Sequence, residues 1–444
     1  MPNQFLSPEG DLETFNYFVT EYWLIDQYIG DKLFVWGPNS FGALGNNTSS
    51  NDGGSVYPVT TFAGGTNWKQ VSAAGQHTAA IKTDGTLWVW GSNSYAQLGG
   101  NTSVSRSTPV TTFAGGTNWK QVSAAGSSVA AIKTDGTLWT WGRAIDGQLG
   151  NNLGRPGVGI GVARSTPVTT FAGGTNWKQV SCGSNDSVAA IKTDGTLWVW
   201  GRNYNGQLGN NEGKSGFTAL SRSTPVTTFA GGTNWKQVSV GRGHMAAIKT
   251  DGTLWIWGLN AYGQLGNNTT STSQTGICTP VTTFAGGTNW KQVSCGDHYT
   301  AAIKTDGTLW VWGRNAIAEL GINNTTNRST PVTTFAGGTN WKQVSCGGFT
   351  SAIKTDGTLW IWGRNYRGNL GNGRFQSSGF DCTTTPVTTF AGGTNWKQVS
   401  VAGNVAAVTS GEQIDIFDPT ISSVAPPPPP APPPPPPGGG GDDN

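Results

Sequence analysis

A short segment with apolar side chains on both faces recurs along the chain. In Leu197-Trp198-Val199-Trp200-Gly201, the aliphatic residues alternate with tryptophan. Neighbouring side chains of a strand point to opposite faces, so both faces of this segment are apolar and must be covered by other sheets. The recurrences span residues 33–37, 87–91, 138–142, 197–201, 254–258, 309–313 and 359–363.

Each recurrence belongs to a longer unit that contains four predicted strands. Asp194-Gly195 predicts a tight hairpin turn between the second and the third strand. Pro225 suits an outer edge strand, because proline cannot donate to a sheet ladder. Ala230-Gly231-Gly232-Thr233-Asn234 then leads into the next unit. The four strands expected in this unit are residues 176–181, 189–193, 197–201 and 225–229.

Seven Trp-Lys-Gln-Val-Ser segments set the period of the repeat. Their tryptophans are separated by 51, 58, 58, 55, 51 and 55 residues, and a period near 50 is typical of a propeller. The chain enters the repeat at a third strand, passes through six complete units and ends after a second strand. We therefore predict an all-β, seven-bladed β-propeller of four-stranded blades, closed by pairing the N- and C-terminal half-blades. Residues 411–417 resemble a further third strand, expected outside the ring or at an edge.

Composition agrees with a fold of short strands and tight turns. Of 444 residues, 67 are glycine and 21 are tryptophan, and only 11% are charged. Such a chain is neither a charged unfolded protein nor a coiled coil. The formal net charge is only +3, so we expect no nucleic-acid partner.

These motifs resemble the regulator of chromosome condensation repeat family. The likeness is carried by Val293-Ser294-Cys295-Gly296, by the Asp-Gly-Thr-Leu-Trp-Val-Trp-Gly of residues 306–313, and by Gly-Gln-Leu-Gly at 147–150, 206–209 and 263–266. It covers about residues 31–410 and implies a seven-bladed propeller, in agreement with the strand count. It also implies nucleotide exchange on a small GTPase. No long charged insertion like the β-wedge of the nuclear exchange factor is visible, and fold alone does not determine function, so this activity is not carried over to the chain.

No set of residues predicts catalysis, a metal or a cofactor. Two of the three histidines occupy one position of the repeat, so we expect structural hydrogen bonds there, because a metal or catalytic role would need clustered carboxylates or thiols. The five cysteines form no Cys-x-x-Cys pair, and three of them share one position of the repeat, where a small buried residue near the axis is expected. We therefore predict a non-enzymatic protein. The residues concerned are His77, His244, His298, Cys182, Cys295 and Cys346.

The segments between the third and fourth strands are the expected binding loops. They differ between units while the strands hardly change, and loops on a rigid scaffold often carry binding. The expected partner of these loops is a protein or a surface glycan. Four arginines follow the Trp-Gly of their units. They either form a partial basic ring on one face or bond to carbonyls of a neighbouring blade. They are Arg143, Arg202, Arg314 and Arg364.

The two ends of the chain differ from the propeller, which we assign to residues 31–417. Apolar residues at 3-4-3-4 spacing predict an amphipathic docking helix in an N-terminal arm, residues 1–30. The arm packs on the propeller's own surface or on a protein partner. Its acidic residues exclude a simple membrane span, and no basic region of a signal peptide precedes it. Residues 418–444 form a Pro/Gly-rich tail that favours polyproline II. The apolar stripe is Phe15, Phe18, Tyr22, Ile25 and Ile29.

Three observations lead to one hypothesis of function. No set of catalytic residues is found, the loops differ between units, and a further segment is attached at each end of the propeller. The protein is a non-enzymatic binding or structural propeller held in a larger assembly, as a virion component or an adhesin-like protein of a cell surface. The alternative is a nucleotide-exchange factor or another regulator of a small GTPase.

Overall fold

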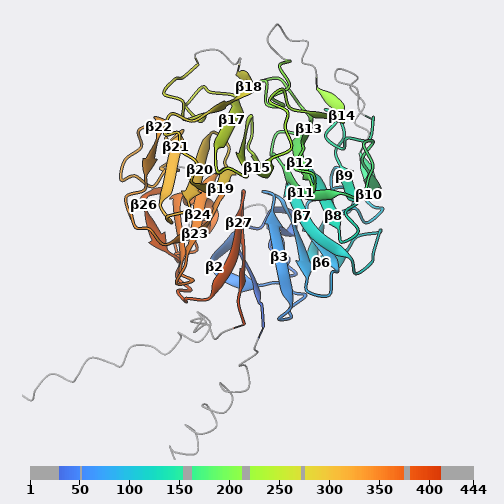
Figure 1. Ribbon diagram of the computed structural model, residues 1–444. Coiled ribbons are helices and arrows are strands. Elements are labelled where there is room, and N and C mark those ends of the chain that lie inside the picture. Colours follow the sequence, from blue (N-terminus) through green and yellow to red (C-terminus); the bar gives the residue numbers. More distant parts are fainter. Residues whose placement is uncertain are drawn as a thin grey trace, which may run out of the picture.

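The fold is a ring of seven four-stranded antiparallel sheets around a central axis, as predicted (Figure 1). The computed structural model describes residues 30–50, 53–153, 163–212, 221–271, 276–374 and 381–411. Within these residues the only helices are the single-turn 3-10 helices η1 (Ser40–Gly42) and η2 (Tyr366–Gly368). The predicted arm stripe, the tail and residues 412–417 lie outside the described residues.

The strands occupy the same four positions in every blade. The inner strands are β3 (Trp68–Ala73), β7 (Trp119–Ala125), β11 (Trp177–Cys182), β15 (Trp235–Val240), β19 (Trp290–Cys295), β23 (Trp341–Cys346) and β27 (Trp396–Val401). The second strands are β4 (His77–Lys82), β8 (Ser128–Lys133), β12 (Ser187–Lys192), β16 (His244–Lys249), β20 (Tyr299–Lys304), β24 (Phe349–Lys354) and β28 (Val405–Thr409).

The third and fourth strands complete each blade toward the periphery. The third strands are β5 (Leu87–Gly91), β9 (Leu138–Gly142), β13 (Leu197–Gly201), β17 (Leu254–Gly258), β21 (Leu309–Gly313), β25 (Leu359–Arg364) and β1 (Leu33–Pro38). The outer strands are β6 (Arg106–Thr111), β10 (Arg164–Thr169), β14 (Arg222–Thr227), β18 (Ile277–Thr282), β22 (Arg328–Thr333), β26 (Cys382–Thr388) and β2 (Gly54–Thr60).

The first two and the last two strands of the described residues share one blade, which closes the ring. Its strand order is β2-β1-β28-β27, and Val35 lies opposite Ala406 in the β1–β28 ladder. The predicted pairing of N- and C-terminal half-blades is therefore confirmed. We call this the closing blade and number it blade 1, so that blades 2 to 7 follow chain order.

The outer strands begin earlier than the sequence predicts. β14 starts at Arg222, three residues before Pro225, and Gly201 pairs with Arg222 while Val199 pairs with Val226. The outer strand thus has more residues than its partner over this stretch, which is a β-bulge. The proline lies in the bulge of an edge strand, where its missing N–H breaks no ladder hydrogen bond.

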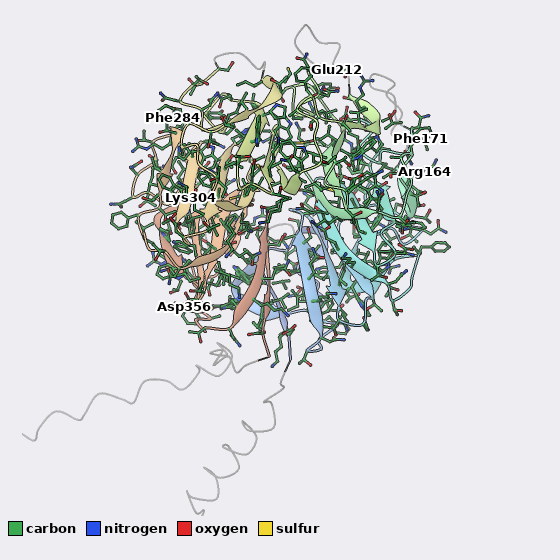
Figure 2. The ribbon with its side chains drawn as sticks, in the orientation of Figure 1. Arg164, Phe171, Glu212, Phe284, Lys304 and Asp356 are labelled. Carbon is green, nitrogen blue, oxygen red and sulfur yellow. The ribbon has the colours of Figure 1, made fainter. Side chains whose placement is uncertain are left out.

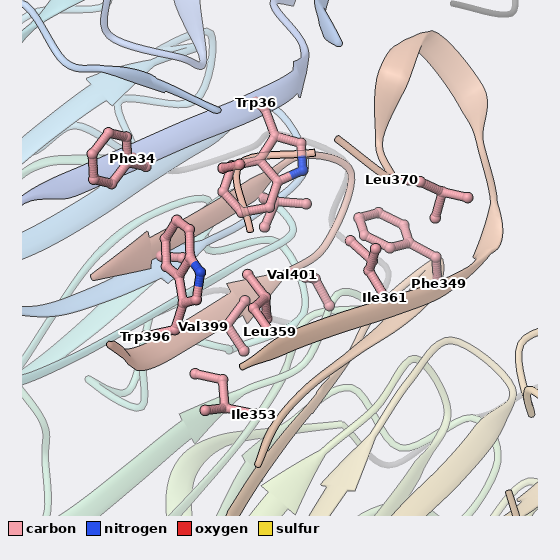
Figure 3. Packing of buried hydrophobic residues seen from close by; sticks show 13 residues of the cluster. Phe34, Trp36, Phe349, Ile353, Leu359, Ile361, Leu370, Trp396, Val399 and Val401 are labelled. Atoms are coloured by element: carbon pink, nitrogen blue, oxygen red, sulfur yellow. The ribbon is translucent and has the colours of Figure 1, made fainter. Parts of the chain in front are cut away.

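The apolar core lies between the blades, as the two-sided third strand predicts. Leu197 and Val199 of blade 4 pack against Trp235 of blade 5, while Trp200 packs on the other side against Ala130 of blade 3. Figure 3 shows the equivalent interface between blade 7 and blade 1, where Leu359 and Ile361 belong to one apolar cluster with Trp396. Each sheet is therefore covered on both faces, and the core is a ring of seven layers.

Polar side chains of one blade satisfy the free edge of the next inner strand. Gln179 Oε1 accepts a hydrogen bond from Val238 N, and Gln179 Nε2 donates to Val238 O, both at 3.0 Å. Ser181 Oγ accepts from Val240 N at 3.1 Å. An exposed edge strand is a site for unwanted pairing, and these side chains occupy its N–H and C=O groups. The same contacts recur at all seven interfaces.

The propeller has two different faces because consecutive strands of a blade are antiparallel. One face, the lysine face, carries the Asp-Gly hairpin turns and the Ala-Gly-Gly-Thr-Asn connectors, and the inner strands begin there with Trp-Lys. The other face, the variable face, carries the connections from first to second and from third to fourth strands. The phenylalanine before each connector is exposed, and Phe171 and Phe284 lie at the rim of the ring (Figure 2).

Candidate functional site

The four predicted arginines all lie on the variable face, where third strands end: Arg364 is the last residue of β25, and the other three directly follow theirs. Arg143 of blade 3 reaches into two neighbouring blades. Its Nη1 donates to Asp186 Oδ2 of blade 4 at 2.7 Å, and its guanidinium carbon lies 5.4 Å from the centre of the Tyr95 ring of blade 2. Gln148 Nε2 donates to the other carboxylate oxygen of Asp186 at 2.9 Å. Arg143 therefore ties three blades together at this face.

The Asp186 carboxylate is buried beneath the arginine. Burial raises its pKa, the Arg143 and Arg202 guanidinium groups lower it, and the Asp146 carboxylate raises it further. Desolvation outweighs the arginines, so the pKa lies above its usual value. A buried carboxylate of this kind holds the arginine in place more than it adds negative charge to the surface.

A second arginine–tyrosine pair follows in blade 4. Arg202 Nη1 donates to Asn185 Oδ1 at 2.5 Å, and its guanidinium carbon lies 4.2 Å from the centre of the Tyr204 ring. The Tyr204 hydroxyl donates to Asp146 Oδ1 of blade 3 at 3.4 Å. Burial, with the Asp146 carboxylate, raises the pKa of Tyr204. The tyrosine therefore stays a neutral donor near neutral pH.

The third pair joins blades 5 and 6. The Arg314 guanidinium carbon lies 5.8 Å from the centre of the Tyr262 ring, and Arg314 Nε lies 3.8 Å from Glu319 Oε1. The His298 ring lies 5.3 Å from the same tyrosine ring, and burial lowers the pKa of His298. Glu319 is buried, which raises its pKa.

The fourth pair lies in blade 7. The guanidinium carbons of Arg364 and Arg367 lie 4.6 and 4.9 Å from the centre of the Tyr366 ring. All four predicted arginines thus lie on one face and stack on tyrosines. Within the described residues, side chains rather than backbone carbonyls hold them.

Sequence reasoning missed the tyrosines of these pairs. Each follows the Trp-Gly of a third strand by three or four residues, so the repeat itself contains the signal that could have found them. Three are more than a third exposed: 44%, 43% and 36% for Tyr95, Tyr204 and Tyr262. Together the arginines and tyrosines define a surface, which we call the arginine–tyrosine surface: Tyr95, Arg143, Arg202, Tyr204, Tyr262, Arg314, Arg364 and Tyr366.

The buried histidines belong to the scaffold. His244 Nε2 lies 3.0 Å from Thr300 Oγ1, as a structural hydrogen bond requires, whereas neither ring nitrogen of His77 has a partner among the described residues. Burial lowers the pKa of His77 to about 4 and that of His244 to about 3. Both rings are therefore neutral near pH 7.

The cysteines of the shared repeat position are also buried. Burial raises the pKa of Cys182 and of Cys346 to about 12, so neither is a thiolate near neutral pH. Across the described ranges, no group of three or more histidine, cysteine or acidic residues could hold a metal ion. In the same ranges, no helix has the length and hydrophobicity needed to cross a membrane.

The amino-acid sequence is similar to those of several known proteins. The ultraviolet-B receptor UVR8 of Arabidopsis thaliana is 31% identical over 230 residues, which are 51% of this chain and 48% of UVR8. The mitochondrial protein RUG3 of the same plant is 27% identical over 312 residues, 68% of this chain and 66% of RUG3. The regulator of chromosome condensation of Mus musculus is 28% identical over 298 residues, 63% and 67% of the two chains. The match thus spans between about half and two thirds of these relatives.

A solved structure shows the same fold. Prp20p from Saccharomyces cerevisiae superposes with a TM-score of 0.72 at 20% identity, covering 87% of this chain and 93% of that structure. Residues 32–411 match the family described as RCC1-like domain, which is most of the chain. The resemblance expected from the repeat motifs is confirmed, and this protein belongs to the RCC1-like domain family.

Proposed function

We propose that this protein is a non-enzymatic, protein-binding regulator that holds its partner on the variable face. The observation that carries the proposal is the arginine–tyrosine surface. Tyrosine and arginine are enriched at the energetic centres of protein interfaces, and charged residues other than arginine are depleted there. Four such pairs on one face of a rigid ring match that composition.

Each of these arginines stacks on a tyrosine ring, and this arrangement favours binding of a partner protein. A guanidinium that already lies over a ring and against Asp186 or Asn185 loses little side-chain freedom when a partner arrives. Its remaining N–H groups can donate to a carboxylate in a bidentate arrangement. The proposed partner surface is therefore acidic opposite the arginines and apolar opposite the tyrosine rings.

The relatives favour a regulator over the virion or adhesin role expected from the sequence. The three relatives compared above are an ultraviolet-B receptor, a mitochondrial protein and a regulator of chromosome condensation, and none is named as a virion component or an adhesin. Prp20p, which shares the fold, has binding properties toward Gsp1p and histones. The proteins that Prp20p binds support a protein rather than a glycan as the partner of this chain.

Nucleotide exchange on a small GTPase is the more specific form of this proposal. It is supported by the match to the mouse regulator of chromosome condensation, which covers 67% of that protein. The test is release of a fluorescent GDP analogue from a panel of small GTPases. Acceleration of at least about tenfold, or 1.4 kcal/mol in the barrier, is expected for the cognate GTPase. Unchanged release from every member of the panel counts against exchange.

The broader proposal is tested with matched variants of the full chain. One variant replaces four arginines of the variable face, and the other replaces four exposed lysines of the lysine face, so both lose the same charge. We expect the first variant to lose affinity for the partner by at least about tenfold and the second to retain it. Equal losses in both would overturn the assignment of the face. The substitutions are Arg143→Ala, Arg202→Ala, Arg314→Ala and Arg364→Ala, against Lys69→Ala, Lys178→Ala, Lys291→Ala and Lys342→Ala.

A further inference from the structure

Seven exposed lysines lie around the axis at the lysine face, one per blade. Each is the second residue of an inner strand, directly after the buried tryptophan that packs between blades. Of these seven lysines, only Lys397 forms an ion pair with another described residue: its Nζ lies 2.5 Å from Asp31 Oδ2. We call this set the ring lysines: Lys69, Lys120, Lys178, Lys236, Lys291, Lys342 and Lys397.

Six other lysines of this face, one in each of blades 2 to 7, are held in place by tryptophan rings. Lys82 Nζ lies 4.9 Å and 4.8 Å from the ring centres of Trp68 and Trp88, and six blades repeat this cation–π arrangement. The nearby Asp84 carboxylate accepts hydrogen bonds from Thr86 N and Oγ1 at 2.8 and 2.7 Å, so it is engaged within its own turn. Apart from Lys397, the ring lysines have neither an ion pair nor a cation–π contact with another described residue.

The lysine face carries most of the positive charge of the molecule. Fourteen of the chain's lysines and seven aspartates lie at this face, whereas the formal net charge of the whole chain is only +3. The rest of the sequence must offset four of these seven excess positive charges, because the net charge of the chain is +3. Residues 1–29 contribute to that offset, because they contain no lysine or arginine and five acidic residues: Glu9, Asp11, Glu13, Glu21 and Asp26.

The N-terminal segment leaves the propeller at this same face. Asp31 forms a bridge with Asn67 beside β3, and its carbonyl accepts a hydrogen bond from Trp68 N at 3.1 Å. Gly30 lies against Thr66 of the connector that leads into β3. The segment therefore starts among the ring lysines, and its nearest carboxylate, that of Asp31, is already paired with Lys397.

We propose that residues 1–29 bind across the lysine face of their own propeller, with their carboxylates paired to the ring lysines that the described residues leave without an ion pair. The Asp31–Lys397 pair is then the first of a series. Neighbouring sheets pack about 10 Å apart, so successive ring lysines are separated by a similar step. Twenty-nine residues span roughly 43 Å even if fully helical, which is enough to pass several blades.

Covalent attachment favours the chain's own segment over a second copy or another acidic partner. A tethered segment acts at an effective concentration in the millimolar range, above that of a free competitor. Individual exposed ion pairs are weak, about 0.2–1 kcal/mol each, so several must act together. The bound segment would cover the ring lysines, and an acidic partner of this face would have to displace it.

A zero-length carbodiimide cross-linker tests this on the unmodified full chain, because it joins carboxylates directly to lysine amines. Peptide mapping by mass spectrometry should find amide bonds from Glu21 or Asp26 to ring lysines such as Lys69 or Lys342. The yield within one chain should be independent of protein concentration and should fall at high salt. Cross-links found only between chains, with a yield that rises with concentration, would overturn the proposal in favour of a second copy. Absence of cross-links between these partners would overturn it altogether.

A second measurement uses cleavage by chymotrypsin at the aromatic residues of the segment. Replacing three ring lysines should accelerate that cleavage by about tenfold, as expected when several weak pairs are lost together. Replacing three arginines of the variable face removes the same charge and should leave the rate unchanged. Equal rates in both variants would contradict the proposal, with near-UV circular dichroism as the check that both are folded. The variants are Lys69→Gln, Lys120→Gln and Lys342→Gln, against Arg143→Gln, Arg202→Gln and Arg314→Gln.

Discussion

The side-chain amide of Gln398 in blade 1 forms hydrogen bonds with the backbone of Val71 in blade 2, 327 residues earlier in the chain, and so closes the ring of contacts between blades. Gln398 Oε1 accepts from Val71 N at 3.0 Å, and Gln398 Nε2 donates to Val71 O at 3.1 Å. Together with six equivalent glutamines, this contact satisfies the inner edge of every blade. The edge strands of the sheets therefore face the axis with their polar groups already paired.

Replacing Gln398 by alanine should lower the free energy of unfolding by about 1–3 kcal/mol. The substitution leaves an N–H and a C=O of Val71 without their partners, and an unsatisfied buried group costs about that much. Thermal or denaturant unfolding measures the change. Lys236→Ala, at an exposed position that precedes an equivalent glutamine, should change stability by less than about 0.5 kcal/mol. A similar loss in both variants would show that the amide contact is not the cause.

Gly371→Ala should destabilise the protein more than Gly392→Ala, although both glycines have φ of +58°. A left-handed conformation costs an alanine about 1–2 kcal/mol at either position. At Gly371 the new Cβ would also lie 2.7 Å from the Trp36 indole nitrogen, whereas at Gly392 nothing lies within 4 Å. This overlap should add about 1–3 kcal/mol and disturb the hydrogen bond from Trp36 Nε1 to Asn369 O. Equal unfolding midpoints for the two variants would refute the steric explanation.

Stability should fall as the pH drops from about 6.5 to about 4, in part because of His77. Burial lowers its pKa in the folded protein to about 4, so in this window the unfolded chain binds a proton that the folded protein does not. Above pH 6.5 the ring is neutral in both states and His77 does not lower the free energy of unfolding. By pH 4 the proton bound by the unfolded chain lowers that free energy by up to about 3 kcal/mol. Phe349 occupies the equivalent position of blade 7, so His77→Phe is a matched replacement. Its unfolding free energy should depend less on pH in this window; an unchanged slope would contradict this origin.

Glu319→Gln should stabilise the protein at pH 7 by about 0.5–1 kcal/mol. Four other blades have glutamine at this position, and burial raises the pKa of Glu319 even though Arg314 lies nearby. The environment therefore disfavours the charged form, and a neutral amide of the same shape removes that cost. The gain should shrink as the pH falls toward the carboxyl pKa. A lower melting temperature at pH 7 would mean that the Arg314 contact outweighs burial.

Most of the fold could be predicted because its causes are local and repeated. Alternation in Leu197–Gly201 shows a strand buried on both sides, and Asp194-Gly195 marks the hairpin before it. Counting such segments gave seven blades and the closing pair of half-blades. The outer strands were less predictable, because their bulges depend on how each one follows the twist of its neighbour.

The candidate site was only half predictable. The position after Trp-Gly singled out the arginines, but their tyrosine partners come partly from other blades, as Tyr95 does for Arg143. Nothing local to Asp186 or Glu319 shows that these carboxylates are buried, since burial depends on loops from neighbouring blades.

The amino-acid sequence by itself therefore determined the repeat, the strands and the number of blades, because hydrophobic alternation and turn residues act over a few positions. Only the tertiary structure decided which side chains share a face: the arginine–tyrosine surface on one side, and on the other the ring lysines beside the exit of the N-terminal segment. Closing the ring brings together residues that are dozens to hundreds of positions apart, and no local pattern encodes those distances.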